Sequence, residues 1–162
     1  MIVAILFLIF GLVSVPASAQ EPTTGKPQIE IRHADQAEFN SEKKEILLTG
    51  SVHIVRGTMS IRADKIEITL SEDERGVKKG IATGHVEIID GTRTGRANKA
   101  IYVADSSEII LSGNPKLTEG PNEIKAERIV YNIKTRSMKA AGRVRGIFIP
   151  SGSVKPGKDK TK

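Results

Sequence analysis

Hydrophobic and polar residues alternate with a period of two through most of the chain between Ile29 and Phe148. Near the middle of the sequence, Ala82, Val86 and Ile88 share one parity, and the residues between them are mostly polar or charged. This alternation predicts antiparallel strands with one buried face and one face in water. No stretch of ten residues has the periodicity of a helix, so we expect an all-β protein.

The alternating pattern recurs in four tandem copies, each marked by an anchor alanine and an anchor glycine. The alanines are Ala34, Ala63, Ala97 and Ala126, and the glycines are Gly50, Gly84, Gly113 and Gly142. Alanine and glycine lie 16 residues apart in copies one, three and four, and 21 apart in copy two. Such a period is typical of stacked units that share one core. We expect about three short strands per copy, with a bulge or bend at each mid-strand glycine.

These strands predict a tandem-repeat antiparallel fold of two facing, curved sheets, in a jelly-roll or flattened-coil form that stays open at both ends. Asn114-Pro115 interrupts the alternation in copy three and predicts a broken or edge ladder there. Unpaired edges at the two ends can accept a strand of another domain. The candidate edge-docking residues are Ile29, Ile31, Ala37, Val144 and Phe148.

The ends of the chain differ from this repeat region. Residues 1–19 combine an uncharged apolar run with an Ala-x-Ala box, which predicts a secretory signal peptide cleaved after Ala19 and thus an exported protein. A membrane anchor is the alternative, but the run is shorter than the ~20 residues that a spanning helix needs. Residues 20–28 are expected to be a flexible linker, residues 29–149 the β-jelly-roll domain, and residues 150–162 a disordered Lys-rich tail.

The composition limits the possible chemistry. The 162 residues include no cysteine, which excludes thiol nucleophiles and disulfides, and the net charge of +6 suits an acidic partner such as lipid phosphates as well as simple solubility. Export argues against nucleic acid. His33, His53 and His85 lack the spacing of metal ligands, so we expect no metal or cofactor.

A polar residue follows each anchor alanine, but its identity varies between copies. These residues are Asp35, Asp64, Asn98 and Glu127. Because the side chain changes from acid to amide, a turn or strand-edge device is favoured over a general base. No catalytic residue is therefore assigned.

The inward rows carry the most informative feature of the sequence. If the two inner faces meet fully, they form a closed core; if the sheets splay, the same residues line a groove for an apolar chain. Small residues such as Gly80, Ala100 and Ala140 favour a partly open space, but periodicity alone leaves both possibilities open. The candidate lipid-binding residues of the interior are Phe39, Leu48, Val52, Ile54, Ile66, Ile68, Ala82, Val86, Ile88, Tyr102, Leu111, Ile129 and Tyr131.

The repeat also resembles a known family. Ile61-Arg62-Ala63-Asp64-Lys65-Ile66-Glu67-Ile68, followed by Gly84-His85-Val86-Glu87-Ile88, is similar to the OstA-like repeat of the LptA family, periplasmic lipopolysaccharide-transport proteins of Gram-negative bacteria. The resemblance covers nearly all of the chain after the predicted signal peptide and linker. The resemblance implies a periplasmic location and a slightly twisted β-jelly roll with an apolar interior that holds the acyl chains of lipid A. It also implies no catalysis, and docking to LptC-like inner-membrane and LptD-like outer-membrane domains or head-to-tail to further copies.

The leading hypothesis is thus a lipopolysaccharide-binding carrier or bridge that shields lipid A acyl chains between the inner and the outer membrane. The alternative is a structural or adaptor β-repeat protein that acts through strand-edge docking without a lipid cargo. A polysaccharide-active enzyme would need paired carboxylates on the concave face. We expect no Asp or Glu in the inward rows, which argues against such an enzyme.

Overall fold

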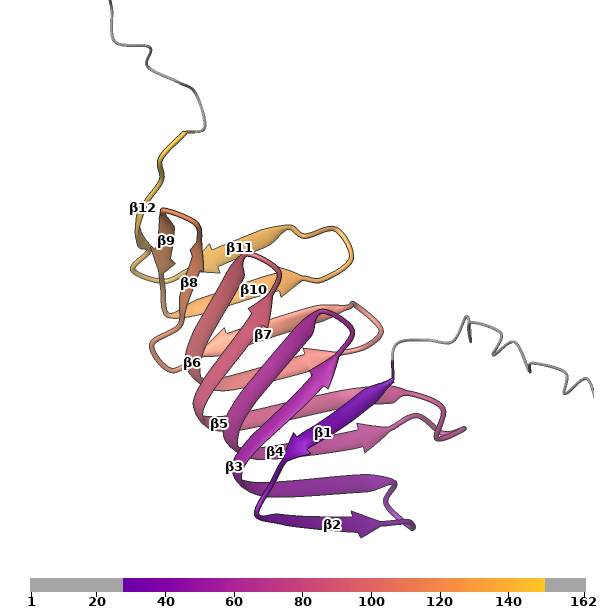
Figure 1. Ribbon diagram of the computed structural model, residues 1–162. Helices are drawn as coiled ribbons and strands as arrows, with labels where there is room; N and C mark the ends of the chain where they lie inside the picture. The colour runs from indigo at the N-terminus through magenta and orange to yellow at the C-terminus, as the bar shows by residue number, and fades with distance from the viewer. Residues whose placement is uncertain (1–27, 151–162) are drawn as a thin grey trace, which may run out of the picture.

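The computed structural model describes residues 28–150, and their regular secondary structure consists of twelve β-strands (Figure 1). In chain order these are β1 (Ile29–His33), β2 (Gln36–Asn40), β3 (Glu45–Arg56), β4 (Met59–Leu70), β5 (Val77–Asp90), β6 (Arg93–Val103), β7 (Glu108–Ser112), β8 (Lys116–Glu119), β9 (Asn122–Lys125), β10 (Arg128–Asn132), β11 (Met138–Ala141) and β12 (Arg145–Ile147). All pairings are antiparallel, and the predicted all-β fold class is confirmed.

Three of the predicted segments fall on parts of the chain that this description does not cover. The predicted signal peptide lies outside residues 28–150, and so do the predicted linker and tail apart from one residue each. Within the described range, no helix has the length and hydrophobicity needed to cross a membrane.

Twelve strands over four copies match the expected average of about three per copy, but four of them are long, because they run through the bend positions instead of ending there. Strands β3, β4, β5 and β6 contain 12, 12, 14 and 11 residues. The pairing register slips within them, for example between Thr83 and Val86. At this slip Gly84 has a φ of 77° and His85 a φ of 45°, both in the left-handed region. The predicted bulge is therefore present, and it turns the strand without ending it.

The bends divide one twelve-stranded sheet into two facing layers, which diverge from a common edge in Figure 1. Layer I consists of β2, 45–49 of β3, 65–70 of β4, 77–83 of β5, 99–103 of β6, β7, β10 and β11. Layer II consists of β1, 52–56 of β3, 59–63 of β4, 86–90 of β5, 93–97 of β6, β8, β9 and β12. The two sheets expected from the pattern are thus two layers of one folded sheet.

The ladder is interrupted in copy three, as the sequence predicted. Strand β7 ends at Ser112 and β8 begins at Lys116, so the segment that contains Asn114 and Pro115 makes no ladder. Pro115 is among the most deeply buried side chains, and proline lacks the N–H that a continuous strand would need. From this point on, each layer is built from short separate strands.

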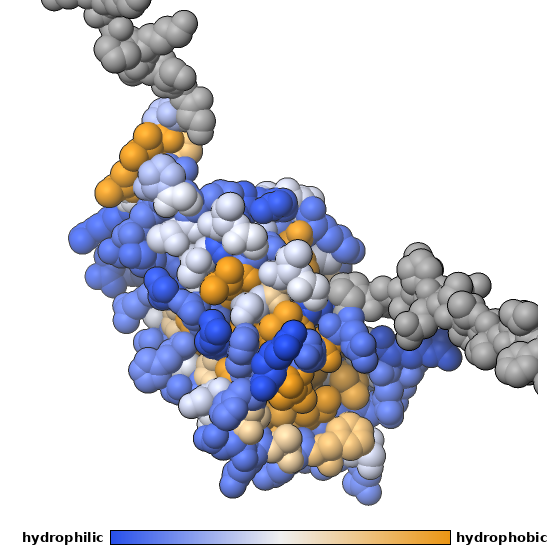
Figure 2. All heavy atoms as spheres, viewed as in Figure 1, coloured by the Kyte–Doolittle hydropathy of each residue, from blue (hydrophilic) through white to orange (hydrophobic). Residues whose placement is uncertain are grey.

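The core lies between the two layers. Inward residues of both layers form one buried cluster that includes Leu48, Val52, Ile66, Leu111 and Ile129. Figure 2 shows hydrophobic residues exposed in the opening between the layers toward the β1–β2 end, and a second group beside the β12 end. The second group corresponds to the exposed side chains of Val144, Ile147, Phe148 and Ile149.

Candidate functional site

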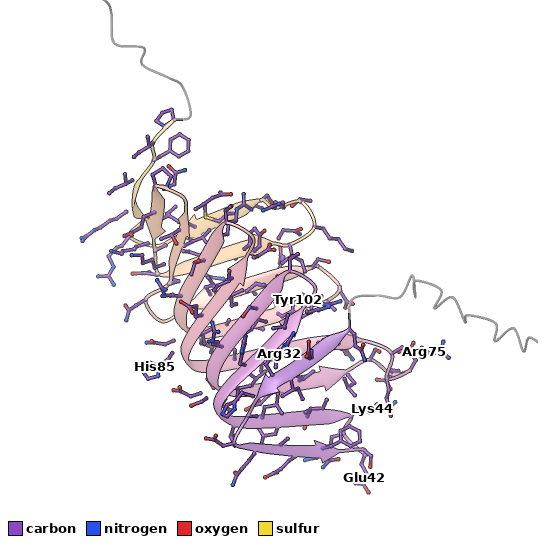
Figure 3. The ribbon with its side chains drawn as sticks, viewed as in Figure 1. Arg32, Glu42, Lys44, Arg75, His85 and Tyr102 are labelled. Carbon is purple, nitrogen blue, oxygen red and sulfur yellow. The ribbon has the colours of Figure 1, made fainter. Side chains whose placement is uncertain are left out.

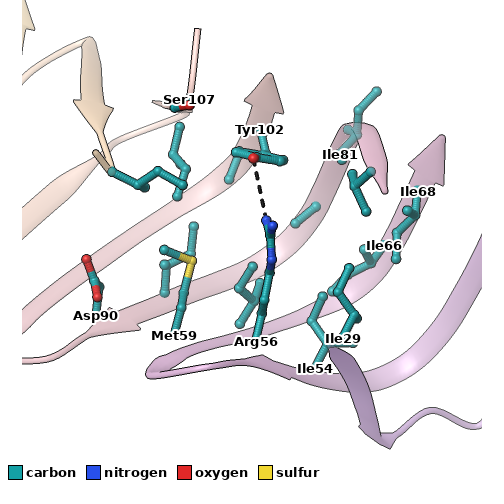
Figure 4. Close-up of a pocket in the computed structure, with 18 of the residues that line it drawn as sticks. Ile29, Ile54, Arg56, Met59, Ile66, Ile68, Ile81, Asp90, Tyr102 and Ser107 are labelled. Carbon is teal, nitrogen blue, oxygen red and sulfur yellow. Dashed lines mark hydrogen bonds between the residues drawn. The ribbon is translucent and has the colours of Figure 1, made fainter. Parts of the chain in front are cut away.

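A cavity of about 340 Å³ opens between the layers (Figure 4). Hydrophobic side chains dominate its wall and come from both layers: Ile54, Ile61 and Ile88 from layer II, and Ile66 and Ile68 from layer I. The wall also contains Gly80, Ala82 and Ala100, which are small. Because leucine or isoleucine there would fill the space, these small residues keep the layers from packing fully.

The thirteen predicted interior residues separate into distinct groups. Six of them line the large cavity: Ile54, Ile66, Ile68, Ala82, Ile88 and Tyr102. Four are packed in the core at no more than 1% exposure: Leu48, Val52, Val86 and Ile129. Leu111 and Tyr131 line a much smaller space of about 20 Å³. Groove and closed core, the two alternatives left open by the pattern, thus occupy different parts of the same interior.

Phe39, the remaining predicted interior residue, lies on the inward side but is 59% exposed. It stands opposite Ile46 in the register of β2 and β3, which places both on the same face of the sheet. Strand β2 is the last strand of layer I, so no further strand covers this ring. The period-two pattern predicts the face to which a side chain points, but not whether a neighbouring strand buries it.

Several residues of the cavity wall were not predicted to lie there. Ile29, assigned to edge docking, lines the cavity, and so do Arg56, Met59 and Asp90. The expectation that no Asp or Glu lies in the inward rows is therefore wrong for Asp90. Its parity matches that of the buried Ile88, so continuing the alternation by one step would have found it.

The other candidate docking residues lie at the two ends of the sheet. Ile31 is in β1 and Ala37 in β2, at one end; Val144 precedes β12 and Phe148 follows it, at the other. Their exposure ranges from 47% for Ile31 to 77% for Phe148 among the large side chains. Their role in docking stays a prediction.

A charged network joins the two layers beside the smaller space. Arg93 of layer II pairs with Glu119 at 2.9 Å and donates hydrogen bonds to the Tyr131 hydroxyl at 3.2 Å and to the Arg136 carbonyl at 2.8 Å. The Tyr131 hydroxyl in turn donates to Asp90 at 2.9 Å. The hydrogen bond to Glu119, above all, raises the pKa of Arg93, so this guanidinium stays charged.

A second arginine reaches across the mouth of the large cavity. The Arg56 guanidinium lies 3.5 Å from the hydroxyl of Tyr102, which faces it from the other layer (Figure 4). Within residues 28–150, Arg56 forms no ion pair with a carboxylate. The mouth of the cavity thus combines a cation with a tyrosine hydroxyl above a hydrophobic interior.

The variable polar residues after the anchor alanines pack against the anchor glycines. A Cβ at Gly50, Gly84, Gly113 or Gly142 would overlap the side chain of Asp35, Asp64, Asn98 or Glu127 respectively. This position supports the predicted role at a bend of the strand. Asp64 also pairs with His85 at 2.9 Å, and His85 extends outward from the bend in Figure 3.

The histidines are spread over the outer surface. His53 is 3.0 Å from the Ser60 hydroxyl, and burial together with the cation Arg62 lowers its pKa. No cluster of three potential metal ligands occurs in residues 28–150. The geometry described here is that of a hydrophobic container with a charged mouth.

A family model described as "LptA/(LptD N-terminal domain) LPS transport protein" matches residues 31–137. The lipopolysaccharide export system protein LptA of Escherichia coli K12 is 29% identical over 150 residues, which cover 85% of this chain and 79% of that protein. LptA of Haemophilus influenzae is also 29% identical, over 129 residues that cover 73% of this chain and 75% of that protein.

The crystal structure of LptH from Pseudomonas aeruginosa has the same fold. LptH is described as the LptA-homologous periplasmic component of the conserved lipopolysaccharide transport device. The match has a TM-score of 0.71 and 14% sequence identity, and it covers 80% of this chain and all of the LptH chain. At this identity the likeness bears on the fold alone.

Proposed function

Because the chain belongs to the family of LptA and LptD N-terminal domains, which are lipopolysaccharide transport proteins, we propose that it carries lipopolysaccharide through the periplasm. The family model spans the repeat region, and the LptA relatives match over most of their own length. The observation that carries the proposal is the cavity of about 340 Å³ between the two layers, because a transport protein for a lipid needs a place that water does not reach.

The cavity has the size of one acyl chain. At roughly 30 Å³ per group of the size of a water molecule, it holds about eleven such groups. Burial of each methylene contributes about 0.8 kcal/mol, so one chain gains roughly 9 kcal/mol before the cost of ordering it. This gain is large enough to hold a chain out of water during transport.

We place the acyl chains of lipid A against the cavity wall and not against the closed core. The best candidates are the hydrophobic residues that line the cavity from both layers: Ile54, Ile61, Ile66, Ile68 and Ile88. Core residues such as Leu48 and Ile129 are fully buried and do not line the cavity, so they serve stability. The lipid-binding set is thus smaller than the set of inward residues.

The two ends of the sheet support a bridge built from similar domains. Each layer contains eight antiparallel segments, so its first and last segments run in opposite directions. A second domain in the same orientation would place its β1 beside β12 and its β2 beside β11, antiparallel in both layers. We propose this head-to-tail docking for LptC-like and LptD-like domains and for further copies of this chain.

An adaptor that acts only through its edges is the second candidate. The exposed hydrophobic residues beside β12, Val144, Ile147, Phe148 and Ile149, favour it because they suit a protein partner without any lipid. The adaptor and the carrier differ in one respect, which is the occupancy of the cavity.

Photo-crosslinking tests the carrier directly. A photoreactive amino acid at Ile66, which lines the cavity and is 3% exposed, should label lipopolysaccharide in Gram-negative cells. The matched control is the neighbouring position Glu67, which points to the opposite face of β4 and should stay unlabelled. Equal labelling from both positions, or none from Ile66 in a folded variant, would leave the adaptor as the better account.

A further inference from the structure

The chain contains two tyrosines, and each one faces an arginine of the opposite layer. Tyr102 of β6 faces Arg56 at the end of β3, and Tyr131 of β10 faces Arg93 at the start of β6. The two tyrosines occupy equivalent places in the repeat, five residues after Ala97 and after Ala126. The molecule therefore contains two versions of one arrangement, and they can be compared.

In the first version the arginine is fully engaged. Arg93 is 18% exposed and contacts the Glu119 carboxylate, the Arg136 carbonyl and the Tyr131 hydroxyl. The guanidinium also lies over the Tyr131 ring, 5.3 Å from its centre. The space beside this arrangement is only about 20 Å³, so no ligand can enter. This version is a structural clasp between the layers.

In the second version an arginine and a tyrosine again face each other across the two layers, but among the described residues no carboxylate pairs with the arginine. Within residues 28–150, the side chain of the half-buried Arg56 makes one hydrogen bond, to the Tyr102 hydroxyl at 3.5 Å, and it borders the cavity of about 340 Å³. Asp90 also lines this cavity, but it lies two strands away along the rim, through Met59, at roughly 10 Å. Asp90 moreover already accepts a hydrogen bond from the Tyr131 hydroxyl.

A half-buried guanidinium without a counter-ion costs free energy, because it has lost part of its hydration. Arginine presents a planar set of donors that matches phosphate and carboxylate oxygens in pairs. An anionic amphiphile fits both the hydrophobic cavity and the unpaired guanidinium of Arg56. Its chain fills the cavity, and its head group gives Arg56 the negative charge that Glu119 gives Arg93.

We propose that Arg56, together with the Tyr102 hydroxyl, binds a phosphate group of the lipid whose acyl chain occupies the cavity. Lys134, from the loop after β10, lines the same cavity and adds a second positive charge at its mouth. This subsite rests on the proposed carrier function and specifies it, since it selects phosphorylated amphiphiles over neutral ones.

Equilibrium binding to the full mature chain tests the subsite with three probes: lipid A with both phosphates, the same lipid A after enzymatic removal of both phosphates, and inorganic phosphate. The Arg56→Gln variant should bind phosphorylated lipid A roughly 10- to 100-fold more weakly, the range expected for the loss of a charged hydrogen bond. Its affinity for the dephosphorylated lipid should equal that of the wild type. Inorganic phosphate alone should neither bind tightly nor compete at equal concentration.

The matched control is Arg62→Gln, which removes the same charge from the outward face of β4, where the side chain is 52% exposed. It should change the affinity for phosphorylated lipid A less than about twofold. Arg56→Lys keeps the charge but loses the paired donors, and a loss of a few-fold is expected. Arg56→Lys takes the place of Arg56→Gln in the binding test if Arg56→Gln does not fold.

The outcomes separate the two proposals. If the wild type binds neither lipid, the carrier function fails. If it binds both lipids and the Arg56 variants bind phosphorylated lipid A like the wild type, only the phosphate subsite is overturned. Tight binding of inorganic phosphate that depends on Arg56 would also overturn it, in favour of a site for free anions.

Discussion

At the scale of single residues, a glycine and its successor shape the whole interior. The four anchor glycines have φ values of 74° to 79°, and the residues that follow them have values of 40° to 58°. Two consecutive left-handed residues insert a bulge and turn the strand. The inward parity is the same on both sides of the turn, as Leu48 and Val52 illustrate, so one strand supplies hydrophobic residues to both layers.

Gly84→Ala should destabilise the protein by about 1–3 kcal/mol, because alanine is strained at this φ and its Cβ would overlap Asp64. The free energy of unfolding in urea measures the effect. Gly76→Ala is the control: the nearest atom to its Cβ would be the Ser71 hydroxyl oxygen at 3.7 Å, so its stability should change little. Equal stability of the two variants would show that the bulge needs no glycine.

Periodicity predicted the direction of most side chains, since parity is a local property of a strand. It placed Ile66 and Val86 on the inward face correctly. It did not predict the exposure of Phe39, which depends on whether another strand follows β2 in the sheet. Nor did it separate cavity from core: Ile66 and Val86 both point inward, but Ile66 lines the cavity, whereas Val86 is packed in the core at 1% exposure.

At the scale of elements, the arrangement depends on contacts between the layers that lie far apart in sequence. Arg93 and Tyr131 are 38 positions apart, and Arg56 and Tyr102 are 46 apart. Neither spacing follows from a strand period or from the repeat, so the sequence predicted the layers but not the contacts that join them. The continuous course of β3 and β5 was missed for a related reason: an anchor glycine in mid-strand is compatible with the end of a strand as well as with a bulge.

Tyr131→Phe should cost about 1–3 kcal/mol of unfolding free energy, because it removes a hydroxyl that contacts both Asp90 and Arg93. Tyr102→Phe is the matched control. Its hydroxyl has one contact at 3.5 Å, so the loss should stay within about 0.5 kcal/mol. Urea unfolding of both variants measures these changes. A larger loss of unfolding free energy for Tyr102→Phe than for Tyr131→Phe would contradict the distinction between the clasp at Tyr131 and the open cavity mouth at Tyr102.

At the scale of the whole molecule, the even number of segments in each layer gives the sheet two complementary ends. Because the end segments differ, the contact joins unlike surfaces and does not close on itself, which permits a chain of domains. Stacking in this way would continue both layers and bring the interior of one domain against that of the next. If the proposed carrier moves a lipid along such a chain of domains, the clasp at Arg93 and Tyr131 would have to open, because it narrows the interior to a space of about 20 Å³.

Cysteine pairing tests this end-to-end contact, and the absence of native cysteine makes every introduced thiol unique. Ile31→Cys in β1 and Ile147→Cys in β12 place thiols on exposed positions of the two ends of layer II. With a short bifunctional maleimide, an equal mixture of the two variants should give crosslinked dimers on a denaturing gel, whereas each variant alone should stay monomeric. Glu67→Cys, on the outer face of layer I, serves as the control partner for either variant and should give no dimer. Crosslinking of Ile31→Cys with itself would instead indicate a symmetric contact between two β1 strands, and a head-to-tail bridge would then be excluded for this chain under those conditions.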